Sequence, residues 1–199
     1  MTWSNVPKED GRRLFIGWMS NWLYANEVPT EIWRSATTLP RSMEIFGKEG
    51  NYLLASRPVV EIEKIRGSSE SLKGKEISIS SDLAEIELEL DSDEFELVLS
   101  NDNGDKVTVS KKGNEIFVDR SLSGLTGFNN EFSNLHTIPD LGLDLKKLRI
   151  FIDRSSLELF FNDGELVITE IVFPESPYTK LTTSGINETV NIHTLKSAW

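Results

Sequence analysis

The segment AEIELEL, residues 84–90, alternates charged and apolar side chains without interruption, and it decides the fold class. Successive side chains of a β-strand point to opposite faces of the sheet, so this alternation predicts one buried face and one face in water. An amphipathic helix would show a period of 3.6 residues, and no segment of the chain sustains that period. We therefore expect an all-β protein.

The same alternation recurs in six further segments, which short runs of turn-forming residues separate. Asn103-Gly104, Gly113 and Asp163-Gly164 stand between them, and residues that tolerate positive φ allow a hairpin to close. Short strands at regular spacing are typical of two packed sheets, so the sequence predicts an antiparallel two-sheet β-sandwich. The six segments are EFELVLS (94–100), DKVTVSK (105–111), NEIFVD (114–119), KLRIFID (147–153), SLELFFN (156–162) and ELVITEIVF (165–173).

Length and charge limit the possible functions. The chain has 199 residues, 38% of them hydrophobic, and a formal net charge of -11. It is long enough to bury one sizeable core, whereas its charge repels phosphate backbones and anionic lipids, so we expect no nucleic-acid partner and no membrane partner. The first 13 residues, MTWSNVPKEDGRR, carry charges where a signal peptide has an apolar core, so no signal peptide is expected and the localisation stays open.

Metal and cofactor chemistry find little support in the residue types. Cysteine is absent, which excludes disulfides and thiolate zinc sites, and His136 and His193 have no patterned ligands nearby. The acidic segments 100–105 and 161–165 lack the oxygen-ligand spacing of a calcium loop and are interpreted as hairpin tips. We therefore expect no metal site and no cofactor.

Two similar segments, IFVDRSLSG (116–124) and IFIDRSSLE (150–158), each contain an Asp-Arg pair. They could be a duplicated catalytic element, but an Asp that caps the turn at a strand end and pairs with the next Arg is the favoured interpretation. An independent enzyme would need a carboxylate pair from residues such as Glu27, Glu31, Asp119 or Asp153, and their spacing singles out no pair. We predict no catalytic residue in this chain.

The N-terminal region differs from the rest, because four of the five tryptophans lie in its first 33 residues. RRLFIGWMSNW (12–22) is predicted to be a strand that leads through a Pro-containing loop to a second strand, WRSATTLPRSMEIF (33–46). An extended first segment would place Trp18, Ser20 and Trp22 on one face, opposite Met19 and Asn21. Indole rings beside hydroxyl and amide groups suit a sugar, although such rings could equally cover the end of a sheet as core residues.

The run GRRLFIGWMSNWLYANEVPTEIWRSATTLPRSMEI resembles a signature of glycoside hydrolase family 32, the family of levanases, inulinases and invertases. The match holds from Gly11 to Arg41, after which Ser42-Met43 replaces the usual Glu-Leu. Later segments such as RPVVEIEKIRG and LRIFIDRSSLELFFNDGELVITEIVFP resemble the C-terminal sandwich of that family. The resemblance implies that residues 1–46 are a remnant of the last blade of a five-bladed β-propeller and that residues 47–199 form the C-terminal β-sandwich module.

The resemblance also implies which chemistry is missing. Family members cleave β-fructosidic bonds with retention, which needs two carboxyl groups about 5–5.5 Å apart. Their carboxylates lie in W-M-N-D-P-N-G, R-D-P and E-C motifs upstream of the signature, and none of these motifs occurs in this chain. What the resemblance carries over is a sugar-binding wall of Trp18 or Trp22, with Ser20 or Asn21 near its rim. We therefore predict these four residues as substrate-binding, and which tryptophan faces the pocket stays open. Trp33 and Arg34 are expected to pair the returning strand and to neutralise a carboxylate beneath it.

The leading hypothesis is a C-terminal fragment of a fructan- or sucrose-hydrolysing β-fructosidase, which supports a propeller and is inactive alone, from a truncated gene or a longer protein. Its substrate partner would be a fructan or sucrose-type carbohydrate once a propeller completes the site. The alternative is a stand-alone fructan-binding module, for which exposed aromatic residues would be needed. The candidates for these aromatic residues are Phe95, Phe128, Phe132 and Tyr178. A third possibility is homo-oligomerisation through exposed blade strands.

Overall fold

The computed structural model describes residues 1–132 and 134–197 and is all-β, apart from one short 3-10 helix, η1 (Val60–Ile65). This confirms the predicted fold class. A small N-terminal sheet contains β1 (Arg13–Phe15), β2 (Arg41–Lys48) and β3 (Asn51–Pro58) in that order. Within the described residues, no helix is long and apolar enough to cross a membrane.

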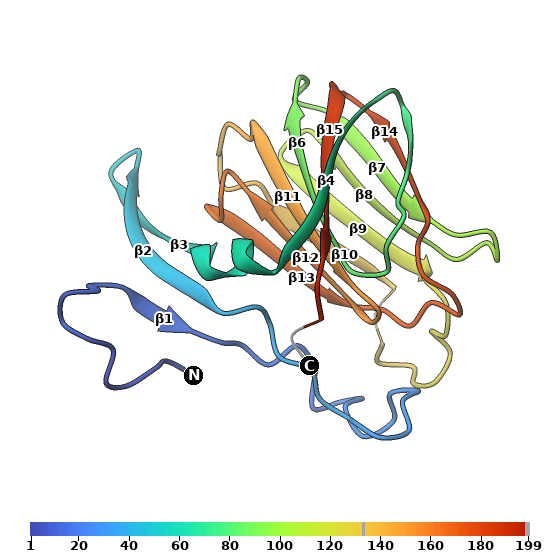
Figure 1. Cartoon of the computed structure of the whole chain (residues 1–199), viewed down its shortest axis with the longest axis horizontal. Coiled ribbons are helices and arrows are strands. Elements are labelled where there is room, and N and C mark those ends of the chain that lie inside the picture. The colour runs from blue at the N-terminus through green and yellow to red at the C-terminus, as the bar shows by residue number, and fades with distance from the viewer. Residues whose placement is uncertain (133, 198–199) are drawn as a thin grey trace.

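Two six-stranded antiparallel sheets form the sandwich (Figure 1). The β7 sheet has the order β10 (Leu135–Pro139), β9 (Glu115–Leu122), β8 (Lys106–Lys112), β7 (Phe95–Ser100), β14 (Lys180–Ser184) and β5 (Glu76–Ser78). The β6 sheet has the order β13 (Leu166–Ile171), β12 (Ser156–Phe161), β11 (Lys147–Asp153), β6 (Ala84–Leu90), β15 (Ile186–Leu195) and β4 (Arg66–Lys73). All seven alternating segments quoted above, 84–90 among them, therefore contain strands of the sandwich.

The main core lies between the two sheets. Ile86 and Ile150 of the β6 sheet belong to one buried cluster with Leu97 and Val118 of the β7 sheet. The hairpin tips predicted from the acidic segments are confirmed, because Asn101 Oδ1 accepts hydrogen bonds from the main-chain N–H groups at 103 and 105, between β7 and β8. The alternation therefore predicts correctly which residues of each sheet face the core.

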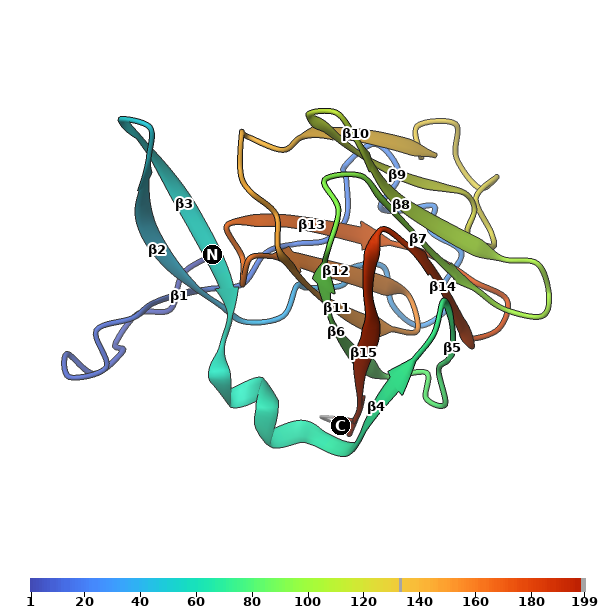
Figure 2. The same ribbon diagram turned by 90° about the horizontal axis from the view of Figure 1, so that it is seen from above.

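A second core covers part of the outer face of the β6 sheet, where the sequence predicts water. Phe151 and Phe160, on neighbouring strands β11 and β12, pack with Val59 and Ile62 from the η1 segment. Figure 2 shows η1 and the β2–β3 hairpin beside the sandwich, with the hairpin tip projecting away from it. Glu85 of β6 is also fully buried. The expectation that the charged residues of the alternating strands face water is therefore wrong for this residue.

The N-terminal sheet also contacts the β12–β13 turn at the main chain. The Ser56 N–H donates to the Gly164 carbonyl over 2.8 Å, and the Arg57 side chain donates to the Asp163 carbonyl over 2.9 Å. The boundary predicted between residues 46 and 47 falls inside β2, and the division into two domains stays a prediction. The N-terminal sheet therefore covers the outer face of the β6 sheet as far as the β12–β13 turn.

We expect Gly164→Ala to weaken this contact. Gly164 has φ +102°, and an added Cβ would lie 2.4 Å from the Ser56 carbonyl oxygen. Strain of this kind typically costs about 1–3 kcal/mol in addition to the positive-φ penalty. Gly104→Ala is the matched control, because Gly104 has φ +92° and open space around its Cβ position. Urea unfolding should show the larger loss for Gly164→Ala, and equal losses would contradict the contact.

Candidate substrate-binding surface

Two exposed tryptophan rings form the centre of the predicted sugar wall. Trp18 is 40% exposed and Trp22 is 86% exposed, and their ring centroids lie 4.9 Å apart with the planes tilted by 55°. Trp18 forms an isolated antiparallel bridge with Thr37, so the main chain is extended at this point. The pair presents a broad apolar surface to solvent beside polar main-chain groups, which is the kind of surface that a sugar ring contacts.

The chain turns at Asn21 instead of continuing as a strand. The Asn21 side-chain oxygen accepts a hydrogen bond from the Leu23 N–H over 2.9 Å, and its carbonyl accepts one from the Ala25 N–H. Asn side chains commonly close such turns because they replace a main-chain acceptor. The prediction of an extended strand through residue 22 is therefore wrong. The turn brings Trp22 back against Trp18.

The two polar residues of the predicted wall differ in their accessibility. Asn21 is exposed, and its amide nitrogen makes no hydrogen bond within the described residues. Ser20 is partly buried, and its hydroxyl oxygen lies inside the structure without a hydrogen-bond partner in the described part of the chain. The exposed group available at the rim is therefore the Asn21 amide.

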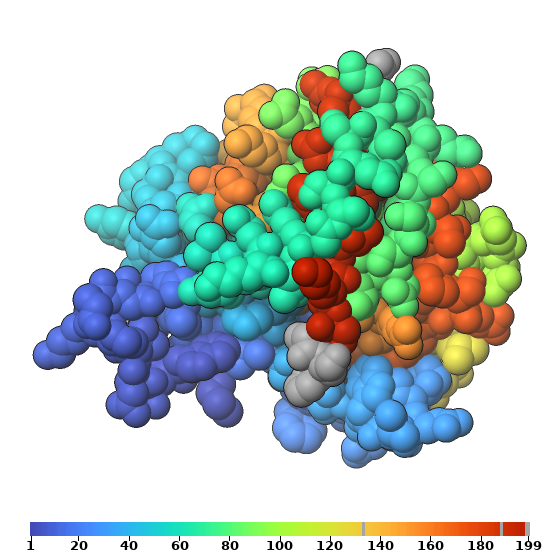
Figure 3. All heavy atoms as spheres, viewed as in Figure 1, coloured from blue at the N-terminus to red at the C-terminus, as the bar shows by residue number. Residues whose placement is uncertain are grey.

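A set of aromatic contacts, here called the aromatic anchor, attaches the loop after Trp22 to the sandwich. It consists of Tyr24, Val28, Phe132, Ile171 and Phe173, and Phe128 and Trp33 pack against it. The Tyr24 ring contacts Phe132 edge-on at 5.2 Å between centroids. Figure 3 shows this loop, in blue, as a lobe at the lower edge of the sandwich. The aromatic anchor therefore fixes the loop that carries Trp22 to the sandwich.

A buried ion pair lies under the aromatic anchor. The Arg120 guanidinium is 3.7 Å from the centre of the Phe132 ring and 3.2 Å from a carboxylate oxygen of Glu170. The same carboxylate contacts His136 Nδ1 at 2.7 Å. Arg120 also donates to the Ile171 carbonyl over 2.8 Å. The anchor is thus fixed by cation–π and charge-assisted contacts as well as by apolar packing.

A second buried ion pair, here called the joint, connects the N-terminal sheet to the β6 sheet. Arg41 of β2 pairs with Glu158 of β12 and donates to the Thr169 hydroxyl over 2.7 Å. Its guanidinium lies 5.0 Å from the centre of the Phe160 ring. The Leu39 N–H donates to the other Glu158 oxygen over 2.6 Å. Burial raises the pKa of Glu158, and contact with Arg41 offsets only part of that rise.

Among the described residues, each fully buried carboxylate is engaged by a cation. Glu158 pairs with Arg41, Glu170 with Arg120, and Asp140 with Lys111. Glu85 accepts hydrogen bonds from both Arg66 and Arg149. Burial would raise the pKa of Glu85, but these two arginines outweigh burial and lower it. Such groups hold the fold together, and none of them is a free carboxylate for acid–base chemistry.

The lowered pKa of Glu85 predicts acid sensitivity. A carboxyl whose pKa is lower in the folded state stabilises the protein above its unfolded pKa, near 4.5, and this stabilisation is lost as the pH falls. We expect Glu85→Gln to cost about 2 kcal/mol at pH 7, because it weakens the hydrogen bonds from two arginines, and to flatten the fall in unfolding free energy as the pH drops below 4.5. Glu89→Gln, on the exposed part of the same strand, should leave this pH profile unchanged. A wild-type profile in Glu85→Gln would contradict the assignment.

Several sequence expectations need correction. Arg120 and Arg154 pair with Glu170 and Asp82 rather than with the Asp residues before them, although those Asp side chains do accept main-chain N–H groups. Arg34 donates to the carbonyl oxygens of Thr30 and Trp33 rather than to a carboxylate. The aromatic candidates for a glycan platform are not exposed: Phe95, Phe132 and Tyr178 are buried and Phe128 is half-buried.

The sandwich and the small N-terminal sheet correspond to two matched domains of one family. Residues 56–198 match the family described as "Glycosyl hydrolases family 32 C terminal", and residues 2–58 match the "Glycosyl hydrolases family 32 N-terminal domain". The chain therefore belongs to glycosyl hydrolase family 32. Within the described residues, no group of three or more His, Cys, Asp or Glu side chains is arranged to hold a metal ion.

Named relatives agree with this family. The levanase of Bacillus subtilis (strain 168) is 38% identical over 222 aligned residues, which cover 100% of this chain and 33% of that protein. The solved exo-inulinase of Aspergillus awamori superposes with a TM-score of 0.79 at 26% identity, over 94% of this chain and 41% of that one. The sucrose-6-phosphate hydrolase of Lactobacillus gasseri gives a TM-score of 0.75 at 25% identity, with coverage of 94% and 39%. The chain thus spans about a third to two-fifths of these relatives.

Proposed function

We propose that this chain is the sugar-wall and support portion of a β-fructosidase. In this proposal Trp18 and Trp22 line the pocket for a terminal fructosyl unit, and the Asn21 amide binds its hydroxyl groups. The catalytic carboxylates come from polypeptide outside these 199 residues, because the family motifs that carry them are not in the sequence. The chain alone is therefore inactive.

The observation that carries this proposal is the attachment of the wall to the sandwich. The aromatic anchor holds Tyr24 and Val28 of the loop after Trp22, and the joint holds Arg41 in the strand that follows, so the loop is fixed to the sandwich at two places. An enzyme gains rate when binding groups are held in place before the substrate arrives. Fixing the wall in this way is the role that we assign to the sandwich.

A chimera tests the proposal. This chain would replace the matching third of the Bacillus subtilis levanase, to which it is 38% identical. We expect a soluble chimera to release fructose from levan. Trp22→Ala in the chimera should lower kcat/KM by about tenfold, since one aromatic wall contributes roughly 1 kcal/mol or more.

Trp3→Ala is the matched control, because Trp3 is exposed to a similar extent as Trp18 and lies outside the wall. It should leave kcat/KM unchanged. A soluble, folded chimera that releases no fructose, or one that Trp22→Ala does not affect, would contradict the proposal.

A further inference from the structure

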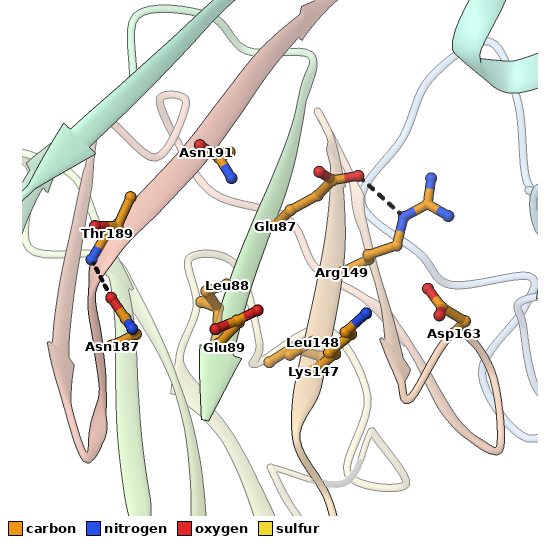
Figure 4. A pocket seen from close by; sticks show the side chains of 10 residues that line it. All are labelled: Glu87, Leu88, Glu89, Lys147, Leu148, Arg149, Asp163, Asn187, Thr189 and Asn191. Carbon is orange, nitrogen blue, oxygen red and sulfur yellow. Dashed lines mark hydrogen bonds and ion pairs between the residues drawn. The ribbon is translucent and has the colours of Figure 1, made fainter. Parts of the chain in front are cut away.

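The outer face of the β6 sheet has a second half that the N-terminal sheet does not cover. A cleft of about 440 Å³ opens there, which is within the range of about 300–1,000 Å³ for small-molecule sites. Here called the polar cleft, it is formed by neighbouring strands β11, β6 and β15 and by the β12–β13 turn (Figure 4). The residues that matter here are Glu87, Glu89, Lys147, Arg149, Thr189 and Asn191.

The side chains of the polar cleft form a row across three strands. Arg149 of β11 and Asn191 of β15 are both register partners of Glu87 on β6, and Lys147 is the partner of Glu89. Neighbouring strands are about 4.8 Å apart, so the row spans roughly 10 Å, about the size of one or two sugar units. The floor of the cleft is therefore continuous across the sheet.

Some side chains of this row have partners within the protein, and others do not. Glu87 lies 2.6 Å from Arg66, 3.5 Å from His193 and 3.6 Å from Arg149, so basic side chains of β4, β15 and β11 hold it in place. The side chains of Glu89, Lys147 and Asn191, in contrast, make no hydrogen bond or ion pair within the described residues. Facing residues of opposite charge commonly pair across strands, yet Lys147 and Glu89 do not. These donors and acceptors are available to a ligand.

The local strand shape also favours a site. The register between β15 and β6 shifts between Ile186 and Val190, beside the polar cleft. The Asn187 side chain accepts a hydrogen bond from the Thr189 N–H over 3.0 Å and so closes the irregular segment. Bulges of this kind redirect side chains and are frequent next to functional sites. Here the irregularity brings Thr189 to the rim of the cleft.

The chemistry of the cleft selects a neutral ligand with many hydroxyl groups. Glu87, Glu89 and Asp163 would repel an anion, whereas Lys147 and Arg149 would repel a cation. A hydroxyl group both donates and accepts, so it can use the amide, carboxylate and ammonium groups together. The cleft contains no aromatic ring. The ligand would therefore be bound through its hydroxyl groups and not by stacking on a ring.

We propose that the polar cleft is a non-catalytic binding site for a β-fructan chain, separate from the tryptophan wall. The choice of fructan rests on the proposed function, whereas the preference for a neutral polyhydroxyl ligand rests on the cleft alone. Such a site would keep the protein on a polymer between cleavage events, because a second attachment point raises the effective concentration of the chain ends.

Affinity electrophoresis of the full chain in gels with levan, inulin or dextran tests this proposal. We expect retardation by levan or inulin and none by dextran. Lys147→Ala/Asn191→Ala should weaken binding by at least about tenfold. Lys106→Ala, an exposed lysine of the opposite sheet, should leave binding unchanged.

Three results would overturn the inference: no retardation by either fructan, equal retardation by dextran, or wild-type binding by the double variant. Loss of binding in Trp22→Ala with retention in the double variant would place the fructan on the tryptophan wall, which overturns the polar cleft but agrees with the proposed function. An active levanase chimera with an unretarded free chain would separate the two proposals in the same way.

Discussion

Replacing Arg41 by Met should break the ion pair of the joint and lower the free energy of unfolding of the protein by about 3–5 kcal/mol. The substitution keeps most of the side-chain length but leaves the Glu158 carboxylate buried without its cation. It also removes the guanidinium from its position near the rings of Phe15 and Phe160. Urea unfolding followed by circular dichroism measures this loss directly.

Arg57→Met is the matched control for the joint. Arg57 lies on β3 of the same sheet, and both its pair with Glu44 and its hydrogen bond to the Asp163 carbonyl are exposed to solvent, so its loss should cost only about 1 kcal/mol. Arg41→Met/Glu158→Leu should recover part of the stability, because two apolar groups replace the buried charges. Equal losses for Arg41→Met and Arg57→Met would contradict the joint.

Phe132→Ala should detach the loop that carries the tryptophan wall. Phe132 is 3% exposed and contacts Tyr24, Phe128 and Arg120, so its removal should cost about 3–5 kcal/mol. The loop would then lose its support and open locally, since few other contacts hold it. Limited trypsin digestion reports the opening through faster cleavage after Arg34, which is exposed.

Phe95→Ala separates this effect from general destabilisation. Phe95 is 4% exposed in the main core between the sheets and does not contact the aromatic anchor. Its loss should be similar in unfolding free energy but should not accelerate cleavage after Arg34 under native conditions. If both variants are cut equally fast there, the aromatic anchor does not hold the loop.

The strands could be predicted from the sequence because alternation reports a local property. Segments 84–90 and 147–153 coincide with β6 and β11, since their inner faces pack into a single core. Alternation cannot report what covers the other face. Phe151 and Phe160 lie on the outer face, in phase with the charged residues Arg149 and Glu158 of the same strands. An aromatic residue at such a position is the signal that the outer face is also buried.

The candidate site could be predicted only in part. Strand alternation predicts Trp18 and Trp22 on one face, and the two rings do lie together, but because of a turn at Asn21 and not because of strand geometry. The joint could not be found from sequence, because Arg41 and Glu158 are distant in the chain and each resembles an ordinary surface charge. A buried ion pair is a property of tertiary packing, and neither partner shows it alone.

The release of fructose from levan, inulin and sucrose by the purified 199-residue chain tests whether the chain is inactive alone. We expect no fructose above the buffer control, because the wall and its support are present without the catalytic carboxylates. Turnover at the rates of ordinary enzymes, about 1–10³ per second, would contradict this expectation.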